Sequence, residues 1–498
     1  MTTDSKIKIT MFHLSSSGSN NYYLYRAASE DLLNKYDIEL LSEEQFRYHR
    51  NIDQSDVYIT THGEYSCDYE KINIDLWHGF PLKGMAKMDK QEQAPDEHVH
   101  QHWSKVDMIM SYSALYNTAM NACNGANISQ YRITGVPRND ALFVDGAKDR
   151  LQSIFPELNT ENDNIVFFMP TFRKSVMTPG KLEGAKEAGN VFGFSEFDKQ
   201  QFTAFLDENQ ITLVLKLHPF EESFFSEELS NMSSQRILIL NDDLLKQNEM
   251  DLYDVLGAAD MLITDYSSVY IDFLLLDRPV MFLPVDLDQY KGNRGLLLEP
   301  YDFWTPGPKA NSQSELQQVI SQMIQDPIWY QAERERIKDI CHHYQDNRAS
   351  ERIWDLIDSY IEEQRDLILE RRRIQQEHKQ LQHQVKKAIQ GMIERNQLAQ
   401  ANEAIEHYLQ SNLPDQDIFA MNGMLHLLNG DPREAILSFK KGYQHFPWDE
   451  DLVYNLGYVH EIIGEAEAAR AYYQKALQMT GKPELQSLII QRLSAIKG

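Results

Sequence analysis

Short apolar runs recur between residues 6 and 284, and polar or turn-forming residues separate them. Runs rich in Ile, Val, Leu and Met predict strands that are buried on both faces, and the segments between them predict helices. The predicted strands lie at residues 6–14, 38–41, 57–61, 72–77, 108–111, 131–134, 165–169, 211–217, 236–240, 261–263 and 280–283. Strands that alternate with helices are typical of a doubly wound parallel sheet.

The alternation restarts after a polar stretch and ends before a long helix. We therefore expect a Rossmann-like domain at residues 1–160 and a second one at residues 161–345. Residues 346–384 predict a connecting helix, because apolar residues recur there at spacings of three and four. These residues are Ile353, Ile357, Tyr360, Leu367, Ile374 and Leu381, and Val385 continues the spacing just beyond the range. The polar residues Gln364, Arg371 and His378 occupy the intermediate positions. The spacing also suits a self-pairing stalk, but polar interruptions favour packing within the chain.

The remaining residues, 385–498, contain a repeat with a period of 34 positions. The matched pairs are Gly423 and Gly457, Gly430 and Gly464, Ala435 and Ala469, and Phe439 and Tyr473. A period of that length, with small residues where two helices would cross, is the signature of tetratricopeptide repeats. We therefore expect an all-α solenoid that binds a protein partner or a second copy of the chain.

Composition narrows the class of protein. The formal net charge of -27 argues against nucleic-acid binding, because a phosphate backbone requires a basic surface. Three widely spaced cysteines argue for a reducing compartment and against a structural zinc site. Residues 1–10 lack the pattern of a signal peptide, and no apolar run is long enough to cross a membrane. We expect a cytoplasmic protein and leave open a peripheral contact with the inner face of the cell membrane.

The segment at residues 261–284 has the features of an anion-binding turn. A buried strand runs into a turn that contains Asp265, Ser267 and Ser268, and the next apolar run predicts a helix with a good N-cap. Free backbone N–H groups and the positive end of the helix meet at such a turn, and the hydroxyls add donors. An ordinary capped helix explains the same residues. A second hydroxyl-rich turn, at residues 15–21, is either a ligand turn or a surface loop.

Histidines and cations stand at other predicted strand ends. His78 lies in the turn WHGFP and His218 in the turn LKLHP, while Lys83 follows His78 closely. Arg138 and Arg173 lie in two further turns. In so acidic a chain, cations concentrated at turns suggest an anionic ligand between the two domains. A histidine after a strand is commonly structural, but the Gly or Pro beside each of these two favours a functional role.

Together these turns resemble those of one family. The motifs, in order, are WHGFPLKGM, TGVPRND, MPTFR, LKLHP, TDYSSVYIDF, RPVMFLPVDLDQY and NRG. The set is similar to that of the CDP-glycerol glycerophosphotransferases of teichoic-acid and capsule synthesis, and it covers residues 70–310. The family implies a GT-B architecture, with the acceptor domain first and the nucleotide domain second. It also implies transfer of glycerol phosphate from CDP-glycerol to an acceptor hydroxyl, with release of CMP.

The resemblance implies roles for the residues in these motifs. His78 matches the proposed general base, and His218 is the second expected catalytic histidine. His218, Ser267 and Ser268 match the positions that hold the donor pyrophosphate.

Five further residues complete the expected site. Arg173, Asp265 and Arg294 match positions near the donor. Lys83 and Arg138 are the expected contacts to the acceptor. The expected ligands are therefore CDP-glycerol and an anionic glycan or polyol-phosphate acceptor, which includes a lipid-linked one.

The residues suit this chemistry. Phosphoryl transfer needs charge neutralisation, in-line placement and a base for the incoming hydroxyl. No metal ligand is predicted and no cofactor is required, although Mg²⁺ is compatible with the reaction. Phe80 stands where Thr is common in the family, and Phe172 where Trp is common, which puts the fit of the acceptor in question.

Several alternatives stay open at this point. CDP-ribitol presents the same CDP end, so a ribitolphosphotransferase fits the same motifs. A nucleotide-sugar glycosyltransferase or epimerase shares the architecture and would turn over UDP-sugars. A scaffold, whose tail recruits a partner and whose front half only binds ligand, would release no CMP. The motifs also do not separate a processive polymerase from an enzyme that adds one or a few units to a primer.

Overall fold

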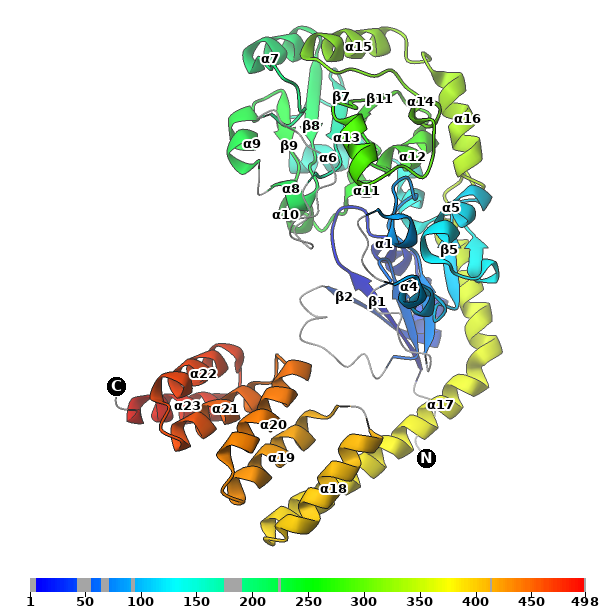
Figure 1. Cartoon of the computed structure of the whole chain (residues 1–498). Coiled ribbons are helices and arrows are strands. Elements are labelled where there is room, and N and C mark those ends of the chain that lie inside the picture. The colour runs from blue at the N-terminus through cyan, green and yellow to red at the C-terminus, as the bar shows by residue number, and fades with distance from the viewer. Residues whose placement is uncertain are drawn as a thin grey trace. The chain divides into compact units, whose positions relative to one another are not determined.

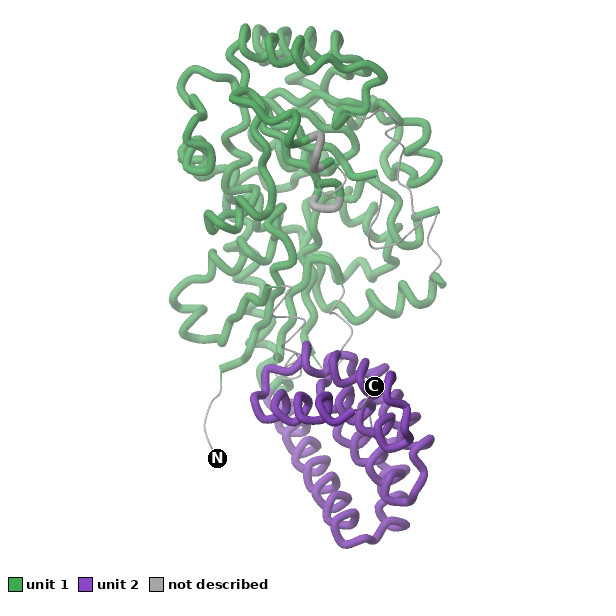
Figure 2. The backbone as a smooth tube through the Cα atoms, turned by 90° about the vertical axis from the view of Figure 1, so that its left-hand side faces the viewer, with its two compact units in different colours: residues 1–368 green, residues 369–498 purple. Residues whose placement is uncertain are grey.

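The computed structural model describes residues 6–42, 55–63, 71–90, 95–173, 190–222, 225–412 and 414–496. The chain divides into two compact units, Met1–Ile368 and Leu369–Gly498, which Figure 2 distinguishes by colour. The first unit contains two α/β halves, and the second is helical.

The first α/β half carries a six-stranded sheet in which every recorded strand pair is parallel (Figure 1). Its strands are β1 (Ile7–His13), β2 (Tyr36–Ser42), β3 (Val57–Thr60), β4 (Ile72–Asp75), β5 (Met108–Ser111) and β6 (Tyr131–Ile133), in the spatial order β2-β1-β3-β4-β5-β6. The order reverses between β1 and β3. Ligands of doubly wound sheets bind at such a switch point, beyond the carboxyl ends of the strands.

The second α/β half carries a five-stranded sheet, again with parallel pairs only. Its strands are β7 (Asn164–Met169), β8 (Ile211–Leu215), β9 (Ile237–Ile239), β10 (Met261–Thr264) and β11 (Val280–Phe282), in the spatial order β11-β10-β7-β8-β9. Strands β8, β10 and β11 are buried along their whole length, as expected for a sheet covered by helices on both faces. Here the switch point lies between β7 and β10. The predicted pair of parallel sheets is confirmed.

Helices connect the strands of both sheets. Those of the first half are α1 (Asn20–Arg26), α2 (Glu30–Lys35), η2 (Ala86–Met88), α4 (Asp96–Trp103), α5 (Ala114–Asn124), η3 (Ile128–Gln130), η4 (Pro137–Phe143) and α6 (Ala147–Ile154). Those of the second half are α7 (Lys199–Glu208), α8 (Pro219–Glu222), α9 (Ser226–Met232), α10 (Asp242–Gln247), α11 (Leu252–Leu256), α12 (Val269–Phe273), η5 (Leu274–Leu276), α13 (Leu287–Asn293), α14 (Tyr301–Trp304), α15 (Gln313–Gln325) and α16 (Gln331–Cys341). Several begin where a side chain accepts a hydrogen bond from the first turn, among them Ser19, Ser113 and Asp198.

Helix α17 (Ala349–Glu394) is the predicted long helix. Its first part packs into the core beside the first sheet through residues that include Ile353, Trp354 and Ile361. The predicted packing is wrong at Leu367, Ile374 and Leu381, which are 45%, 54% and 57% exposed. The last predicted position, Val385, packs against a cluster of the helical unit. Seven-residue spacing gives one helix face but does not say what covers it.

The second unit contains α18 (Leu398–Ser411), α19 (Gln416–Leu428), α20 (Pro432–His445), α21 (Glu450–Ile462), α22 (Ala466–Met479) and α23 (Pro483–Ala495), after the end of α17. Equivalent residues of the 34-residue repeat have equivalent contacts. Gly423 lies against the ring of Phe439, and Gly457 lies against the ring of Tyr473, so neither glycine has room for a side chain. The tetratricopeptide assignment itself stays a prediction. No helix in the part of the chain that the structure describes is both long and apolar enough to cross a membrane.

Candidate functional site

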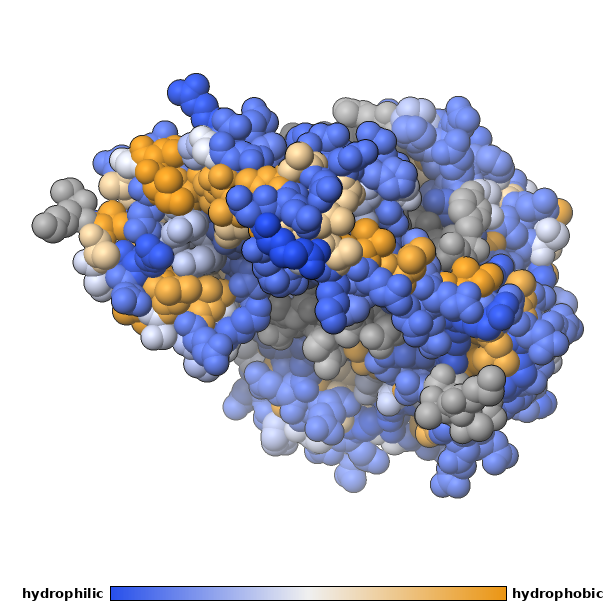
Figure 3. Space-filling model, turned by 90° about the horizontal axis from the view of Figure 1, so that it is seen from below, coloured by the Kyte–Doolittle hydropathy of each residue, from blue (hydrophilic) through white to orange (hydrophobic). Residues whose placement is uncertain are grey.

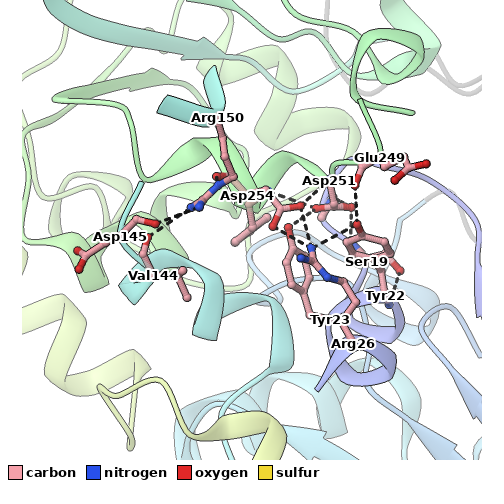
Figure 4. A network of polar contacts seen from close by, with 12 residues as sticks. Ser19, Tyr22, Tyr23, Arg26, Val144, Asp145, Arg150, Glu249, Asp251 and Asp254 are labelled. Carbon is pink, nitrogen blue, oxygen red and sulfur yellow. Dashed lines mark hydrogen bonds and ion pairs between the residues drawn. The ribbon is translucent and has the colours of Figure 1, made fainter. Parts of the chain in front are cut away.

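Polar contacts form a junction between the two α/β halves of the first unit, and Figure 4 shows one group of these contacts. The carboxylate of Asp251, which is fully buried, accepts hydrogen bonds from the N–H groups of Gly18 and Ser19, each at 3.1 Å, and from the Tyr23 hydroxyl at 3.1 Å. Asp251 caps α11 of the second half, whereas its three partners belong to the first half. Burial raises the pKa of Asp251 to about 7, because the backbone donors offset only part of the desolvation.

The serine-rich turn after β1 belongs to the same junction. The hydroxyls of Ser15 and Ser17 donate to the Asp242 carboxylate at 3.0 and 2.7 Å, and the Ser16 carbonyl accepts from the N–H of Leu252 at 2.9 Å. The expectation of a flexible surface loop is wrong, because the Ser15 and Ser17 hydroxyls and the Ser16 carbonyl bind the other half of the protein. The alternative of a ligand turn stays a prediction.

Arg138 links the turn that carries His78 to the second half. Its guanidinium donates to the carbonyl oxygens of His78 and Gly18 at 2.8 and 3.0 Å, and it forms a buried ion pair with Asp272 at 2.6 Å. Asp272 lies in α12, the helix that begins directly after Ser268. The structure therefore places Arg138 inside the junction, with its charge neutralised by Asp272.

The carboxylate of Asp75 fixes the turns that follow β3 and β4. It accepts from the Thr60 hydroxyl at 2.9 Å, from the N–H of Gly63 at 3.1 Å and from the N–H of Trp77 at 2.8 Å. The next residue, His78, donates from Nδ1 to the Thr61 carbonyl oxygen at 3.0 Å. Because a carbonyl oxygen only accepts, this bond places the proton of neutral His78 on Nδ1 and leaves Nε2 as the basic atom.

A second histidine, His62, was not predicted. Its ring stacks on that of His78, with ring centroids 4.1 Å apart and planes 10° apart. The surrounding protein lowers the pKa of His78 well below its usual value, and His62, Arg138 and Lys83 act in the same direction. The side chains of His62 and His78 are both exposed to solvent. Nearby cations therefore contribute to the lowered pKa of His78 in addition to its desolvation. The signal for His62 was its place directly after a predicted strand, as for His78.

Two predicted donor residues form a buried ion cluster at the switch point of the second sheet. Arg173 pairs with Asp286 at 2.7 Å and with Asp265 at 2.8 Å, and its side chain also donates to the Thr171 carbonyl oxygen at 2.6 Å. The Asp265 carboxylate accepts from the N–H of Thr171 at 2.7 Å. The cluster thus fixes the turn after β7 to the turn after β10, and the Arg173 charge is neutralised within the protein.

Ser267 and Ser268 lie in the turn after β10 that this ion cluster fixes, and both side chains are half-buried. Asp265 and Ser267 do not cap α12; its N-cap is Ser268, whose side chain makes no capping bond. The helix has only five residues before a 3-10 turn, so its dipole is weaker than predicted. Across the junction, a methyl group at Gly79 would lie 2.6 Å from the Ser268 hydroxyl oxygen. Within the described residues neither serine hydroxyl has a recorded partner, so both can donate to a ligand beside the His78 turn.

His218 meets residues of both halves. Its ring lies 4.6 Å from that of Phe172, and the Lys83 ammonium of the first half lies 5.4 Å from the same Phe172 ring. Burial, followed by the charges of Lys83 and Lys216, lowers the pKa of His218 to about 3. A neutral histidine among cations can donate one hydrogen bond to an anion that the cations attract.

The remaining predicted residue, Arg294, also spans the junction. Its guanidinium pairs with Asp89 at 2.8 Å, and Lys83 forms a backbone bridge with the nearby Leu296. Arg294 and Lys83 therefore hold the second half against the loop that follows His78. No group of three or more His, Cys, Asp or Glu side chains that could hold a metal ion occurs among the residues described.

Comparisons with known proteins support one family. Residues 9–359 match the family model described as CDP-Glycerol:Poly(glycerophosphate) glycerophosphotransferase. The teichoic acid poly(ribitol-phosphate) polymerase of Bacillus spizizenii is 27% identical over 300 residues, which are 57% of this chain and 42% of that protein. The teichoic acid glycerol-phosphate primase of Bacillus subtilis is 26% identical over 294 residues, which are 58% of this chain and 68% of that protein. The chain thus spans less than half of the polymerase.

The fold is similar to that of a solved structure, the wall teichoic acid polymerase TagF. The TM-score is 0.56 at 21% identity, over 72% of this chain and 90% of that chain. The likeness shows a shared GT-B-like fold. Because the family model spans more than half of the sequence, the chain belongs to the CDP-glycerol:poly(glycerophosphate) glycerophosphotransferase family.

Proposed function

We propose that this protein transfers glycerol phosphate from CDP-glycerol to a hydroxyl of a primer or growing glycan or polyol-phosphate chain, with release of CMP. One observation carries the proposal. The Ser267 and Ser268 hydroxyls, without partners among the described residues, lie at the switch point of the second sheet, and Ser268 contacts Gly79, the neighbour of His78. An acceptor-side base and donor-side hydroxyls are therefore adjacent.

The donor half of the site is residues 161–345 in this proposal. Ser267, Ser268 and His218 donate hydrogen bonds to the pyrophosphate of CDP-glycerol, and Lys83 supplies a positive charge from the opposite half. Arg173 and Asp265 act indirectly, because their charges are already paired in the buried cluster. They fix the turn on which the two serines lie.

The acceptor half is residues 1–160. His78 accepts the proton of the acceptor hydroxyl at Nε2, since Nδ1 is held by the Thr61 carbonyl. Its lowered pKa keeps it unprotonated at neutral pH. Arg138 holds the His78 main chain in place, while Lys83 and the Arg294 pair keep the halves together.

The reaction then requires one displacement. The acceptor oxygen attacks the phosphorus that carries glycerol as its proton passes to His78, and the bond from that phosphorus to the CMP oxygen breaks. CMP leaves with the bonding electron pair, and the glycerol phosphate remains on the acceptor. No covalent enzyme intermediate is needed.

A ribitolphosphotransferase and a nucleotide-sugar glycosyltransferase are the alternative activities, and the donor that each uses distinguishes them from a glycerophosphotransferase. The relatives named above include a ribitol-phosphate polymerase as well as a glycerol-phosphate primase, so CDP-ribitol is the second candidate donor. The purified protein should be assayed with CDP-glycerol, CDP-ribitol and UDP-glucose, with release of CMP or UDP as the readout. CMP release from CDP-glycerol supports the proposal. UDP release from the sugar nucleotide alone would indicate a glycosyltransferase and would contradict it.

For the helical unit we infer a tetratricopeptide-like solenoid that binds a protein partner or a second copy of the chain. The repeated glycine–aromatic contacts support the repeat, and the exposed residues Leu367, Ile374 and Leu381 give α17 an apolar stripe. On the face that Figure 3 shows, hydrophobic residues form patches within a mostly hydrophilic surface. A contact with an acidic membrane or a lipid-linked acceptor fits the same proposal, with the protein at the inner face of the cell membrane.

A further inference from the structure

The stacked pair of His62 and His78 is held from two neighbouring strands. His62 follows β3 and His78 follows β4, and the Asp75 carboxylate binds the N–H groups of Gly63 and Trp77, one on each turn. Thr61 contacts both rings, since its hydroxyl lies 2.8 Å from His62 Nδ1 and its carbonyl accepts from His78 Nδ1. Asp75 therefore fixes the main chain beside each histidine, and Thr61 fixes the two near-parallel rings.

The stack removes a freedom that the Thr61 bond alone leaves to His78. One hydrogen bond sets the tautomer, but the imidazole can still tilt about it. The His62 ring lies nearly parallel to His78 at 4.1 Å between centroids and restricts that tilt, together with the tilted Trp77 ring at 4.3 Å. A base misplaced by 1 Å can lose on the order of 10²-fold in rate. We propose that His62 is a positioning residue for His78, which holds Nε2 in the orientation that the acceptor hydroxyl meets. This inference rests on the proposed function.

The charges around the pair suit a base that works in its neutral form. Two cations act on the pair: Arg138 on η4 acts on both rings, and Lys83 on the loop after β4 acts on His78. From the second half the neutral His218 lies close to His62, and Lys216 lies beside His218. Burial and Arg138 lower the pKa of His62 to about 4, so that it stays neutral near pH 7. A neutral ring can remain stacked on His78 when His78 takes up a proton, whereas a second charge would repel it.

Removal of the His62 ring has a consequence that a purely structural residue would not show. Water would reach the face of His78 that the His62 ring covers. Desolvation is the largest cause of the lowered His78 pKa, so this change raises that pKa towards its usual value. A phenylalanine at position 62 would keep the flat ring and its shielding and would lose only the nitrogen atoms.

The experiment compares His62→Ala and His62→Phe with the wild type in the full-length protein. We expect His62→Ala to lower kcat for CMP release about tenfold, with unchanged affinity for CDP-glycerol, and His62→Phe to stay within about threefold of wild type. The acid limb of the kcat/KM profile should move to higher pH in His62→Ala and much less in His62→Phe. Equal losses in the two variants, or a wild-type kcat in His62→Ala, would overturn the inference.

A titration without substrate separates this inference from the proposed function. The pKa of His78 is measured by NMR of ¹⁵N-labelled histidine in the substrate-free proteins, with His78→Ala used to assign the signal. His62→Ala should raise that pKa and His62→Phe should leave it low. If the pKa of His78 is unchanged in His62→Ala, the His62 ring does not influence His78, and the inference is refuted even if the protein releases CMP. Absence of CMP release by the wild type refutes the proposed function, while the titration still decides the coupling. If His62→Ala does not fold, His62→Phe carries both measurements, and a tenfold loss in that variant refutes the inference.

Discussion

The two sheets of the first unit each have a switch point, but the two points are used differently. In the first sheet, the turn after β1 directs Ser15, Ser17 and the N–H of Gly18 to carboxylates of the second half. In the second sheet, the charges beneath the turn are paired with each other, and the hydroxyls of Ser267 and Ser268 lie on top. Topology marks both turns as candidate ligand sites. The recorded partners distinguish the two turns. The Ser15 and Ser17 hydroxyls of the first turn donate to Asp242, whereas the Ser267 and Ser268 hydroxyls of the second have no recorded partner among the described residues.

The largest effect should come from His78, the proposed base beside the second switch point. His78→Ala should lower kcat for CMP release by about 10² or more, because general-base catalysis contributes at least that much. CMP release under saturating CDP-glycerol measures it. His378→Ala on the exposed part of α17 is the control and should keep the wild-type rate. A His78→Ala variant with wild-type kcat would show that His78 is not the general base.

A pair of matched double variants tests the difference between the switch points. Ser267→Ala with Ser268→Ala should weaken CDP-glycerol binding by about 10²- to 10⁴-fold, since each of two hydrogen bonds to a charged group contributes about 1.5–3 kcal/mol. Ser15→Ala with Ser17→Ala should leave that affinity unchanged and lower the melting temperature, because it removes bonds to Asp242. Calorimetric titration and thermal unfolding give the two readouts. If both double variants lose donor affinity equally, the turn after β1 contributes to donor binding as much as the turn after β10, which contradicts the proposed difference.

The junction at the first switch point should also respond to pH through Asp251. Its pKa is raised to about 7 in the folded protein from an ordinary value of 3.8, so the folded state binds more protons than the unfolded state between these values. Stability should therefore fall as pH rises from 5 to 7, by about 1.4 kcal/mol per unit at most. Urea unfolding of the wild type and of Asp251→Asn measures this, since asparagine keeps a carbonyl for the Gly18 and Ser19 N–H groups. Stability curves that stay parallel across this range would contradict the assignment.

The smallest effect should come from the helical unit. A chain that ends at residue 368, the boundary of the first compact unit, should keep kcat on a small soluble acceptor within about twofold. The sheets, His78 and Ser267 all precede that boundary. A shortened protein that is folded but inactive would make the helical unit part of the active enzyme.

The sequence was informative about what lies close together along the chain. Apolar runs located the strands, and the turns with His78 and His218 lie at strand ends as predicted. The sequence did not reveal which polar residues would bind each other when they lie far apart along the chain. Nothing in the serine-rich turn indicated that Ser17 would bind Asp242, and nothing near Arg173 indicated that Asp286 would neutralise it. These contacts depend on how the two halves pack, which local periodicity does not encode.

The central claim is that the donor is held by the second half and the base comes from the first. The most direct test is calorimetric titration of CDP-glycerol into wild type, His78→Ala and His218→Ala. The account predicts that His78→Ala binds the donor as the wild type does although its turnover is lost, and that His218→Ala binds it more weakly. A His78→Ala variant that loses donor affinity and keeps its maximal rate would show that the two histidines have the opposite roles.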